Sequence, residues 1–107
     1  MGIMSPTEIT EKFEEIFAAK IKLMNEEMDK CFDTSLKAGL ITPLEGEVFF
    51  HLKVGQTRIH SKYSVVEFQK AFVERLNSTG WVCGSWNVID EEGIYKYYLN
   101  FTAAKKT

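Results

Sequence analysis

The sequence is poor in the residues that build disulfide, metal or membrane-spanning sites. Among its 107 residues, two are cysteines, two are histidines and two are prolines. Cys31 and Cys83 lie far apart without CxxC spacing, so we expect two reduced, buried thiols, with a disulfide as the alternative. No apolar run approaches the ~20 residues that span a membrane. We therefore expect a soluble, cytoplasmic protein with no membrane partner.

Catalytic groups are equally sparse. Spacing brings together no carboxylate pair, Ser-His-Asp set or Cys-His dyad, and the sequence has no glycine-rich phosphate loop, RNP motif or helix-turn-helix signature. His51 and His60 could share a metal ion, but the nearest acids, Glu47 and Glu67, lack the spacing of further ligands. The sequence therefore predicts a protein that is not an enzyme and has no metal or cofactor.

The composition is that of an ordinary globular protein, with 45% hydrophobic and 13% aromatic residues. We expect one α+β domain over residues 1–107. The net charge of −2 conceals an asymmetry. Residues 1–46 carry nine acids against five lysines, whereas residues 47–107 carry eight basic residues against six acids. This balance disfavours a general DNA coat protein and allows a small anion site.

A capping box marks the start of a long first helix. Ser5 supplies the N-cap hydroxyl, Pro6 occupies the first helical position, and Glu8 follows at the third. Apolar residues then recur every three or four positions until Gly39, a C-cap residue. We therefore predict a helix over residues 5–38.

Two β-hairpins are expected on either side of a second helix. The first hairpin spans residues 46–63, with Gly55 providing the positive φ of its turn. The second helix spans residues 64–79, and the second hairpin spans 81–102 and turns at residues 90–93. Residues 103–107 are expected to fray. The order α-ββ-α-ββ predicts an antiparallel sheet with both helices on one face.

Alternating residues suggest a register for each hairpin. In the first, Leu52 would lie opposite Ile59 on the core face, and Lys53 opposite Arg58 and His51 opposite His60 on the other face. In the second, the predicted core pairs are Val88 with Tyr95, Trp86 with Tyr97, Gly84 with Leu99, and Val82 with Phe101. The predicted core comprises Leu52, Ile59, Phe68, Phe72, Trp86 and Leu99.

The first helix is longer than its own domain can cover, because 34 residues extend about 50 Å. We therefore expect a homo-oligomer, most simply a dimer, whose interface includes Phe17, Ile21, Met24 and Met28.

Cationic residues gather next to the second helix. Lys53, Arg58, His60 and Lys62 alternate with apolar residues, and Ser64 begins a helix whose free amides favour an anion. We expect these five residues to form an anion site; the alternative is a solvated strand face. Phe49 and Tyr98 would add a stacking surface for a base if they share that open face.

Four segments together resemble small accessory proteins of tailed bacteriophages. They are the helix end Leu36-Lys37-Ala38-Gly39, the strand from Val48 to Leu52, the segment from Arg75 to Val82, and the strand from Tyr95 to Phe101. The resemblance covers most of the chain in pattern and carries over no functional residue. It implies a virus-encoded protein that acts in the host cytoplasm by occupancy rather than catalysis.

The favoured function is therefore a non-catalytic binding protein that inhibits a host protein or sequesters a small nucleotide-like anion. The alternatives are a nucleic-acid-binding module and a structural, oligomeric scaffold, with a small enzyme as the least favoured reading.

Overall fold

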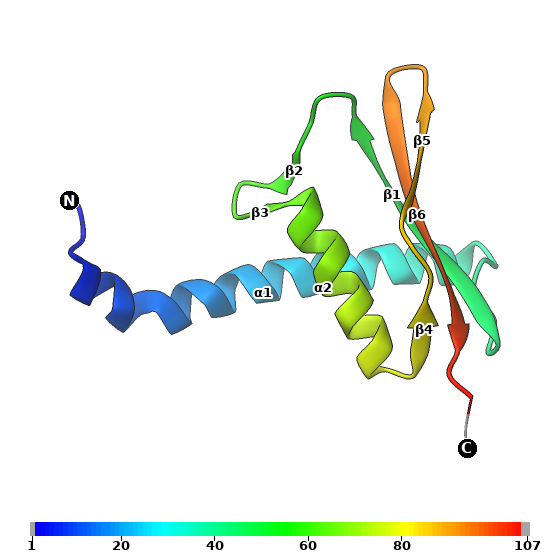
Figure 1. Ribbon diagram of the computed structural model, residues 1–107, viewed down its shortest axis with the longest axis horizontal. Coiled ribbons are helices and arrows are strands. Elements are labelled where there is room, and N and C mark those ends of the chain that lie inside the picture. Colours follow the sequence, from blue (N-terminus) through cyan, green and yellow to red (C-terminus); the bar gives the residue numbers. More distant parts are fainter. Residues whose placement is uncertain (1, 106–107) are drawn as a thin grey trace.

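The chain folds into two helices and six strands in a computed structural model that describes residues 2–105. The fold is α+β, as predicted, and measures 50 × 43 × 22 Å (Figure 1). The elements are α1 (Pro6–Lys37), β1 (Glu45–Lys53), β2 (Arg58–His60), β3 (Tyr63–Ser64), α2 (Val65–Ser78), β4 (Trp81–Cys83), β5 (Asn87–Glu91) and β6 (Ile94–Ala103).

Both helices begin where serine side chains cap them. Ser5 Oγ accepts a hydrogen bond from the Glu8 amide at 3.2 Å, and Ser64 Oγ accepts one from the Glu67 amide at 3.2 Å. Each bond satisfies one of the amides that a helix N-terminus leaves free. The α1 helix ends before Gly39, which adopts a φ of 78°. The predicted helices are therefore confirmed to within a residue or two at each end.

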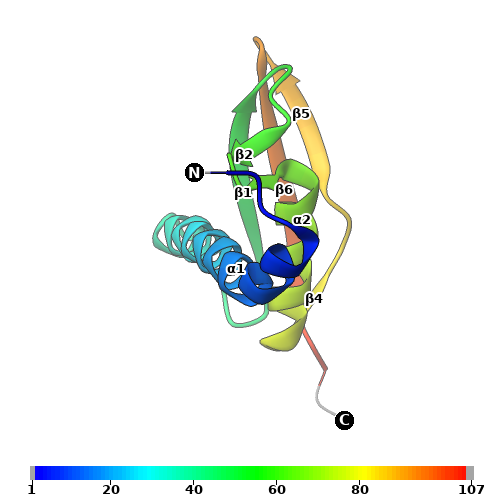
Figure 2. The ribbon, with the colours of Figure 1, turned by 90° about the vertical axis from the view of Figure 1, so that its left-hand side faces the viewer.

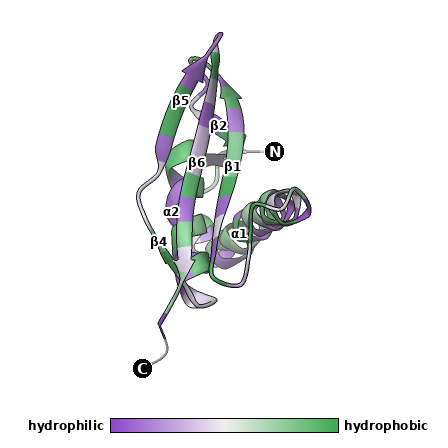
Figure 3. Cartoon of the chain, turned by 90° about the vertical axis from the view of Figure 1, so that its right-hand side faces the viewer, coloured by the Kyte–Doolittle hydropathy of each residue, from purple (hydrophilic) through white to green (hydrophobic). Residues whose placement is uncertain are grey.

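Strand β6 is the centre of the main sheet. It pairs antiparallel with β1 along one side and with β5 and β4 along the other. Both helices pack against the same face of this sheet, α1 on β1 and α2 on β4 (Figure 2). The opposite face, seen in Figure 3, has no helix over it among the described residues.

The predicted first hairpin is wrong. The β1 strand pairs with β6 over nine positions, from Glu45 opposite Thr102 to Lys53 opposite Ile94. The β2 strand instead pairs with β3 in a separate two-stranded sheet. Gly55 does adopt a positive φ of 90°, but its turn leads the chain out of the main sheet rather than back along β1.

The reason is the greater apolar surface that β6 offers. Leu99 and Phe101 of β6 are buried, and they extend the core face that β1 forms with Val48 and Leu52. The segment predicted to pair with β1 would bring Ile59 and Tyr63 to that face, together with the polar residues Thr57 and Ser61. Long-range burial therefore determines the strand partner against the local turn signal.

The second hairpin exists but with a different register. Its loop is Glu92-Gly93, and both residues have a positive φ, as a two-residue type I′ turn requires. Val88 lies opposite Tyr97 rather than Tyr95, a shift of two residues that preserves the faces. A break between β4 and β5 then places Val82 opposite Thr102 rather than Phe101.

The core lies between the sheet and the two helices. Of the predicted core residues, four are buried and two, Ile59 and Trp86, are partly buried. Aromatic rings bridge the layers, with Phe68 5.3 Å from Phe50 and 5.5 Å from Phe72. The Trp86 ring contacts both Phe50 and Phe72, and its Nε1 donates to the Gln69 carbonyl at 3.1 Å.

The first two residues of the predicted frayed tail are instead held by backbone hydrogen bonds. Ala103 ends β6 opposite Trp81, and the Ala104 amide donates to the Gly80 carbonyl at 2.9 Å. These bonds join residues 103 and 104 to β4 and to the glycine between α2 and β4. Residues 106–107 of the predicted tail lie outside the described residues.

Candidate functional site

The first helix has a covered half and an uncovered half. Its first 15 residues, 6–20, extend beyond the sheet and α2, and we call them the arm (Figures 1 and 2). Four large apolar side chains of the arm are between 47% and 58% exposed: Ile9, Phe13, Ile16 and Phe17. Such a contiguous exposed set on a helix marks an interaction surface.

The exposed side chains continue the stripe that builds the core. Phe17 precedes Met24 by seven residues and Phe13 precedes it by eleven, spacings that return to the same face of a helix. The Phe13 and Phe17 rings stack at a centroid distance of 6.0 Å. One apolar stripe therefore runs along α1, and only its C-terminal half is buried in the chain's own core.

The predicted oligomer interface is wrong at two of its four residues. Met24 is 4% exposed and Met28 is 3% exposed, because both pack into the core of this chain. Phe17 is exposed and Ile21 is partly buried, so both lie where a partner could reach them. The correction arises because periodicity identifies the apolar face of a helix but not the point at which the body begins to cover it.

An ion pair ties the base of the arm to α2. Lys20 Nζ lies 2.8 Å from Glu67 Oε2 at the first turn of α2. The hydrogen bond from Lys20 holds the pKa of the Glu67 carboxyl below its usual value, and the Arg58 charge acts in the same direction. The charges of Arg58 and of Lys20, at the base of the arm, therefore act on the same carboxylate.

The predicted anion site is only partly assembled. Arg58 and Ser64 are directly paired across β2 and β3, and His60 lies opposite Tyr63. Lys62 is in the turn between these strands, whereas Lys53 lies on β1 opposite Ile94 rather than opposite Arg58.

Internal hydrogen bonds already engage several of these groups. Arg58 Nη2 donates to the Ser61 carbonyl at 2.8 Å, and His60 Nδ1 accepts from the Lys62 amide at 3.2 Å. The Ser64 hydroxyl caps α2 through the Glu67 amide. The segment 53–62 nevertheless carries three cationic residues and no acid, so its field is positive.

The two histidines do not share a site. His51 lies opposite Lys96 in the main sheet, and His60 lies opposite Tyr63 in the small one. The separation follows from the different strand partner of β1. Within residues 2–105, no group of three or more histidine, cysteine or acidic side chains is placed to hold a metal ion.

The open sheet face carries a small aromatic and cationic cluster. Phe49 lies directly opposite Tyr98, as a shared stacking surface requires. Lys96 Nζ lies 5.0 Å above the Phe49 ring, and the His51 ring centroid is 5.5 Å from that of Phe49. The condition stated for a stacking surface, that the two rings share the open face, is therefore met, although through a strand pairing different from the predicted one.

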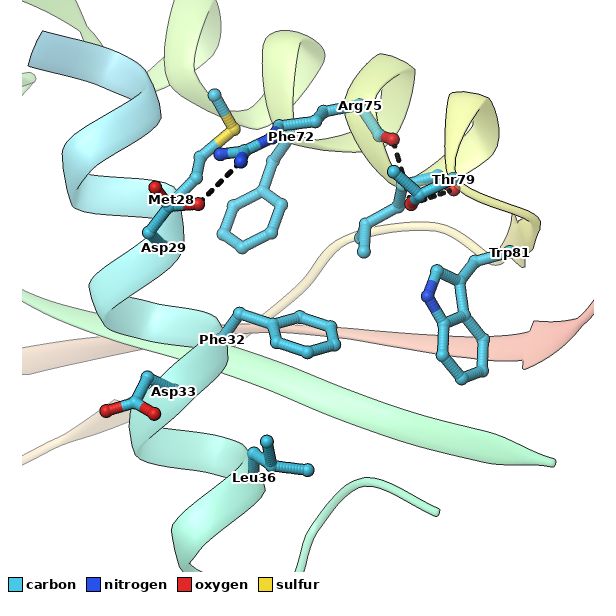
Figure 4. A pocket seen from close by; sticks show the side chains of 10 residues that line it. Met28, Asp29, Phe32, Asp33, Leu36, Phe72, Arg75, Thr79 and Trp81 are labelled. Carbon is cyan, nitrogen blue, oxygen red and sulfur yellow. Dashed lines mark hydrogen bonds and ion pairs between the residues drawn. The ribbon is translucent and has the colours of Figure 1, made fainter. Parts of the chain in front are cut away.

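A groove between α1, α2 and β4 was missed by sequence reasoning. Its volume is about 330 Å³. At its rim, Arg75 Nη2 lies 2.5 Å from Asp29 Oδ1, and Nη1 donates to the Asn25 carbonyl at 3.1 Å. The lining includes Met28, Phe32, Leu36, Phe72, Leu76 and Trp81 (Figure 4).

A sequence signal for the groove does exist. Phe32 and Leu36 lie four residues apart and form a second apolar row beside the main stripe of α1. The groove offers van der Waals contact to an apolar group, and its charged rim is already paired.

The two cysteines are free thiols. Burial raises the pKa of Cys31 to about 11 and also raises the pKa of Cys83. Both side chains therefore remain protonated near neutral pH and are poor nucleophiles.

Comparison with family models, curated proteins and solved structures finds no match to this chain. In the part of the chain that the structure describes, neither helix combines the length and apolar character needed to cross a bilayer.

Proposed function

We propose that this protein is a non-catalytic binding protein that acts by occupying a protein surface through its arm. The observation that carries this proposal is the uncovered stripe of Ile9, Phe13, Ile16 and Phe17. Aromatic and aliphatic anchors of this kind supply most of the free energy of protein–protein contacts, because water is removed from both partners.

The class of partner follows from the surroundings of the stripe. The remaining positions of the arm include four glutamates and two lysines, so the apolar anchors lie on an acidic helix. A complementary surface therefore combines an apolar groove with basic residues. The resemblance to phage accessory proteins is the reason to look for such a surface on a host protein.

The test is affinity capture with matched variants from the cells in which the protein is made. The wild type is expected to retain one stoichiometric protein partner in moderate salt. Phe13→Glu combined with Phe17→Glu should abolish capture, because charges replace the two anchors. Leu44→Glu is the matched control, since Leu44 is 76% exposed and lies outside α1. Equal capture by all three proteins would contradict the proposal.

A second candidate function is binding of single-stranded nucleic acid at the open sheet face. The direct pairing of Phe49 with Tyr98 beside Lys96 favours it, because bases stack on such rings while cations meet phosphates. Fluorescence anisotropy with short oligonucleotides tests it. Binding should fall steeply with salt and be lost in Phe49→Ala, and binding unaffected by that change would exclude this face.

A small nucleotide-like anion at Arg58, His60, Lys62 and Ser64 is the third candidate. Calorimetric titration with mononucleotides checks it, and Arg58→Glu should abolish any heat of binding. A signal that survives this change would place the anion elsewhere.

A further inference from the structure

The arm and the β2–β3 hairpin project from the same side of the body (Figures 1 and 2). Lys20 at the base of the arm contacts Glu67, and the charge of Arg58 on β2 acts on that same carboxyl. The two projecting elements therefore start from one place, the N-terminus of α2.

Their charges are opposite and are not matched within one chain. Residues 6–20 carry four glutamates against two lysines, whereas residues 53–62 carry three cationic residues and no acid. The ion pairs within residues 2–105 are Lys20–Glu67, Lys37–Asp33 and Arg75–Asp29, none of which joins an arm glutamate to the hairpin. An acidic helix and a basic hairpin thus remain available to an external partner.

One row of the apolar stripe, which begins on the arm and ends at Ile21 directly after it, reads the same in both directions. Ile9, Phe13, Phe17 and Ile21 are spaced by four residues each, in the order Ile-Phe-Phe-Ile. Reversing the helix exchanges Ile9 with Ile21 and Phe13 with Phe17, and the apolar ridge keeps its chemistry. A two-fold interface requires this kind of self-complementary patch.

We infer that the partner of the arm is a second copy of this chain, with the two arms packed antiparallel, stripe to stripe. This inference rests on the proposed function, because it names the partner of the same surface. Ile9 and Phe13 of one arm pack against Ile21 and Phe17 of the other. Ridges formed by residues four apart interdigitate at a crossing angle of about 50°, so the arms cross rather than coil.

The antiparallel direction of the two arms follows from their charge and from the room that the two bodies need. Parallel arms would bring two acidic N-terminal halves together and place two bodies side by side at one end. In the antiparallel pair, the bodies lie at opposite ends. The acidic start of each arm reaches the base of the other, where Arg58 and Lys62 supply positive charge. The cationic hairpin thus holds the carboxylates of the second copy.

Light scattering after size-exclusion chromatography, over a range of protein and salt concentrations, tests the stripe. The wild type is expected to be a dimer that dissociates more readily as salt increases. Phe13→Glu with Phe17→Glu should be monomeric at every concentration, with its circular dichroism retained because both side chains are exposed. Leu44→Glu should remain dimeric. A monomeric wild type, or a dimer in the Phe13/Phe17 variant, would overturn the inference.

Charge reversal tests the pairing of arm with hairpin. Arg58→Glu with Lys62→Glu should weaken dimerisation by about tenfold or more, as should Glu8→Lys with Glu11→Lys at the acidic start of the arm. The chain that carries all four changes should recover most of the wild-type affinity. Lys70→Glu with Lys105→Glu alters the net charge as the hairpin variant does and should leave the dimer intact. Failure of the four-change chain to recover would overturn the assigned contact.

The proposed function and this inference fail in different ways. A monomer that still captures another protein through Phe13 and Phe17 refutes the second copy and leaves the binding function standing. A monomer that captures nothing through these residues refutes both.

Discussion

The two halves of α1 share one sequence pattern and have opposite environments. At Met24, Met28 and Cys31 the apolar stripe is buried against the rest of the chain, whereas its side chains between Ile9 and Phe17 are exposed. There the helix extends beyond the sheet and α2 (Figure 2). Amphipathic periodicity shows which side of a helix will be covered, but the covering surface comes from other elements. In this protein those elements reach only half of the helix, and the remainder is available for binding.

The largest expected difference between the halves concerns a buried charge. Met24→Glu should unfold the protein, since an unpaired carboxylate in the core costs several kcal/mol against a total stability of ~5–15 kcal/mol. Phe17→Glu introduces the same carboxylate two turns earlier and should keep the free energy of unfolding within ~0.5 kcal/mol, because the site is exposed. Urea denaturation of both variants makes the comparison. A folded Met24→Glu monomer would mean that the stripe is not covered where the structure places it.

Truncation gives the same contrast without introducing charge. Met28→Ala should lower the free energy of unfolding by ~2–5 kcal/mol through lost burial and a residual cavity. Phe13→Ala should change it by less than ~0.5 kcal/mol. Both values should be measured under conditions in which the protein is monomeric. If both variants lost the same free energy of unfolding, the two halves of α1 would not differ in burial.

The covered half also contains a polar group that weakens it. Ser35 Oγ is fully buried and has no hydrogen-bond partner in the described part of the chain. Ser35→Ala removes the desolvation cost of the hydroxyl and raises helix propensity, so the free energy of unfolding should rise by ~1 kcal/mol. A fall in thermal stability of this variant would show that the hydroxyl is satisfied in solution.

The smallest expected effect lies at the junction of the two halves. The lowered pKa of Glu67 means that its pairing with Lys20 stabilises the fold above the carboxyl's usual pKa of 4.5 and is lost as the pH falls through the lowered value. Solvent screening of this exposed pair keeps the effect below ~1 kcal/mol. Between about pH 5 and pH 3, the wild type should lose more stability than Lys20→Ala. If the stability of the two proteins fell equally with pH, the Lys20–Glu67 pair would not stabilise the contact between the arm and α2.

Local signals in the sequence predicted local structure well. Ser5 and Ser64 located both helix starts, Gly55 indicated a turn with positive φ, and the turn predicted over residues 90–93 contains the observed loop. These predictions succeed because caps and turns depend on a few neighbouring residues.

Long-range choices were predicted less well. The partner of β1 depends on the burial of Leu99 and Phe101, about fifty residues later, which a local turn signal does not contain. The same limit explains why Met24 was assigned to the surface and why the groove beside Phe32 was missed. In each case the local pattern was present, and the element that covers it was distant in sequence.

The central position of β6 has a consequence for the order in which the protein can fold during synthesis. Its partners β1, β4 and β5 all precede it in the sequence, and within residues 2–105 they are joined into the main sheet only through β6. While the ribosome makes the chain, the nine residues of β1 therefore emerge long before the strand that will pair with them. The nascent protein exposes an apolar strand beside an amphipathic helix until Ile94–Ala103 has been translated, so chaperones can engage it throughout that interval.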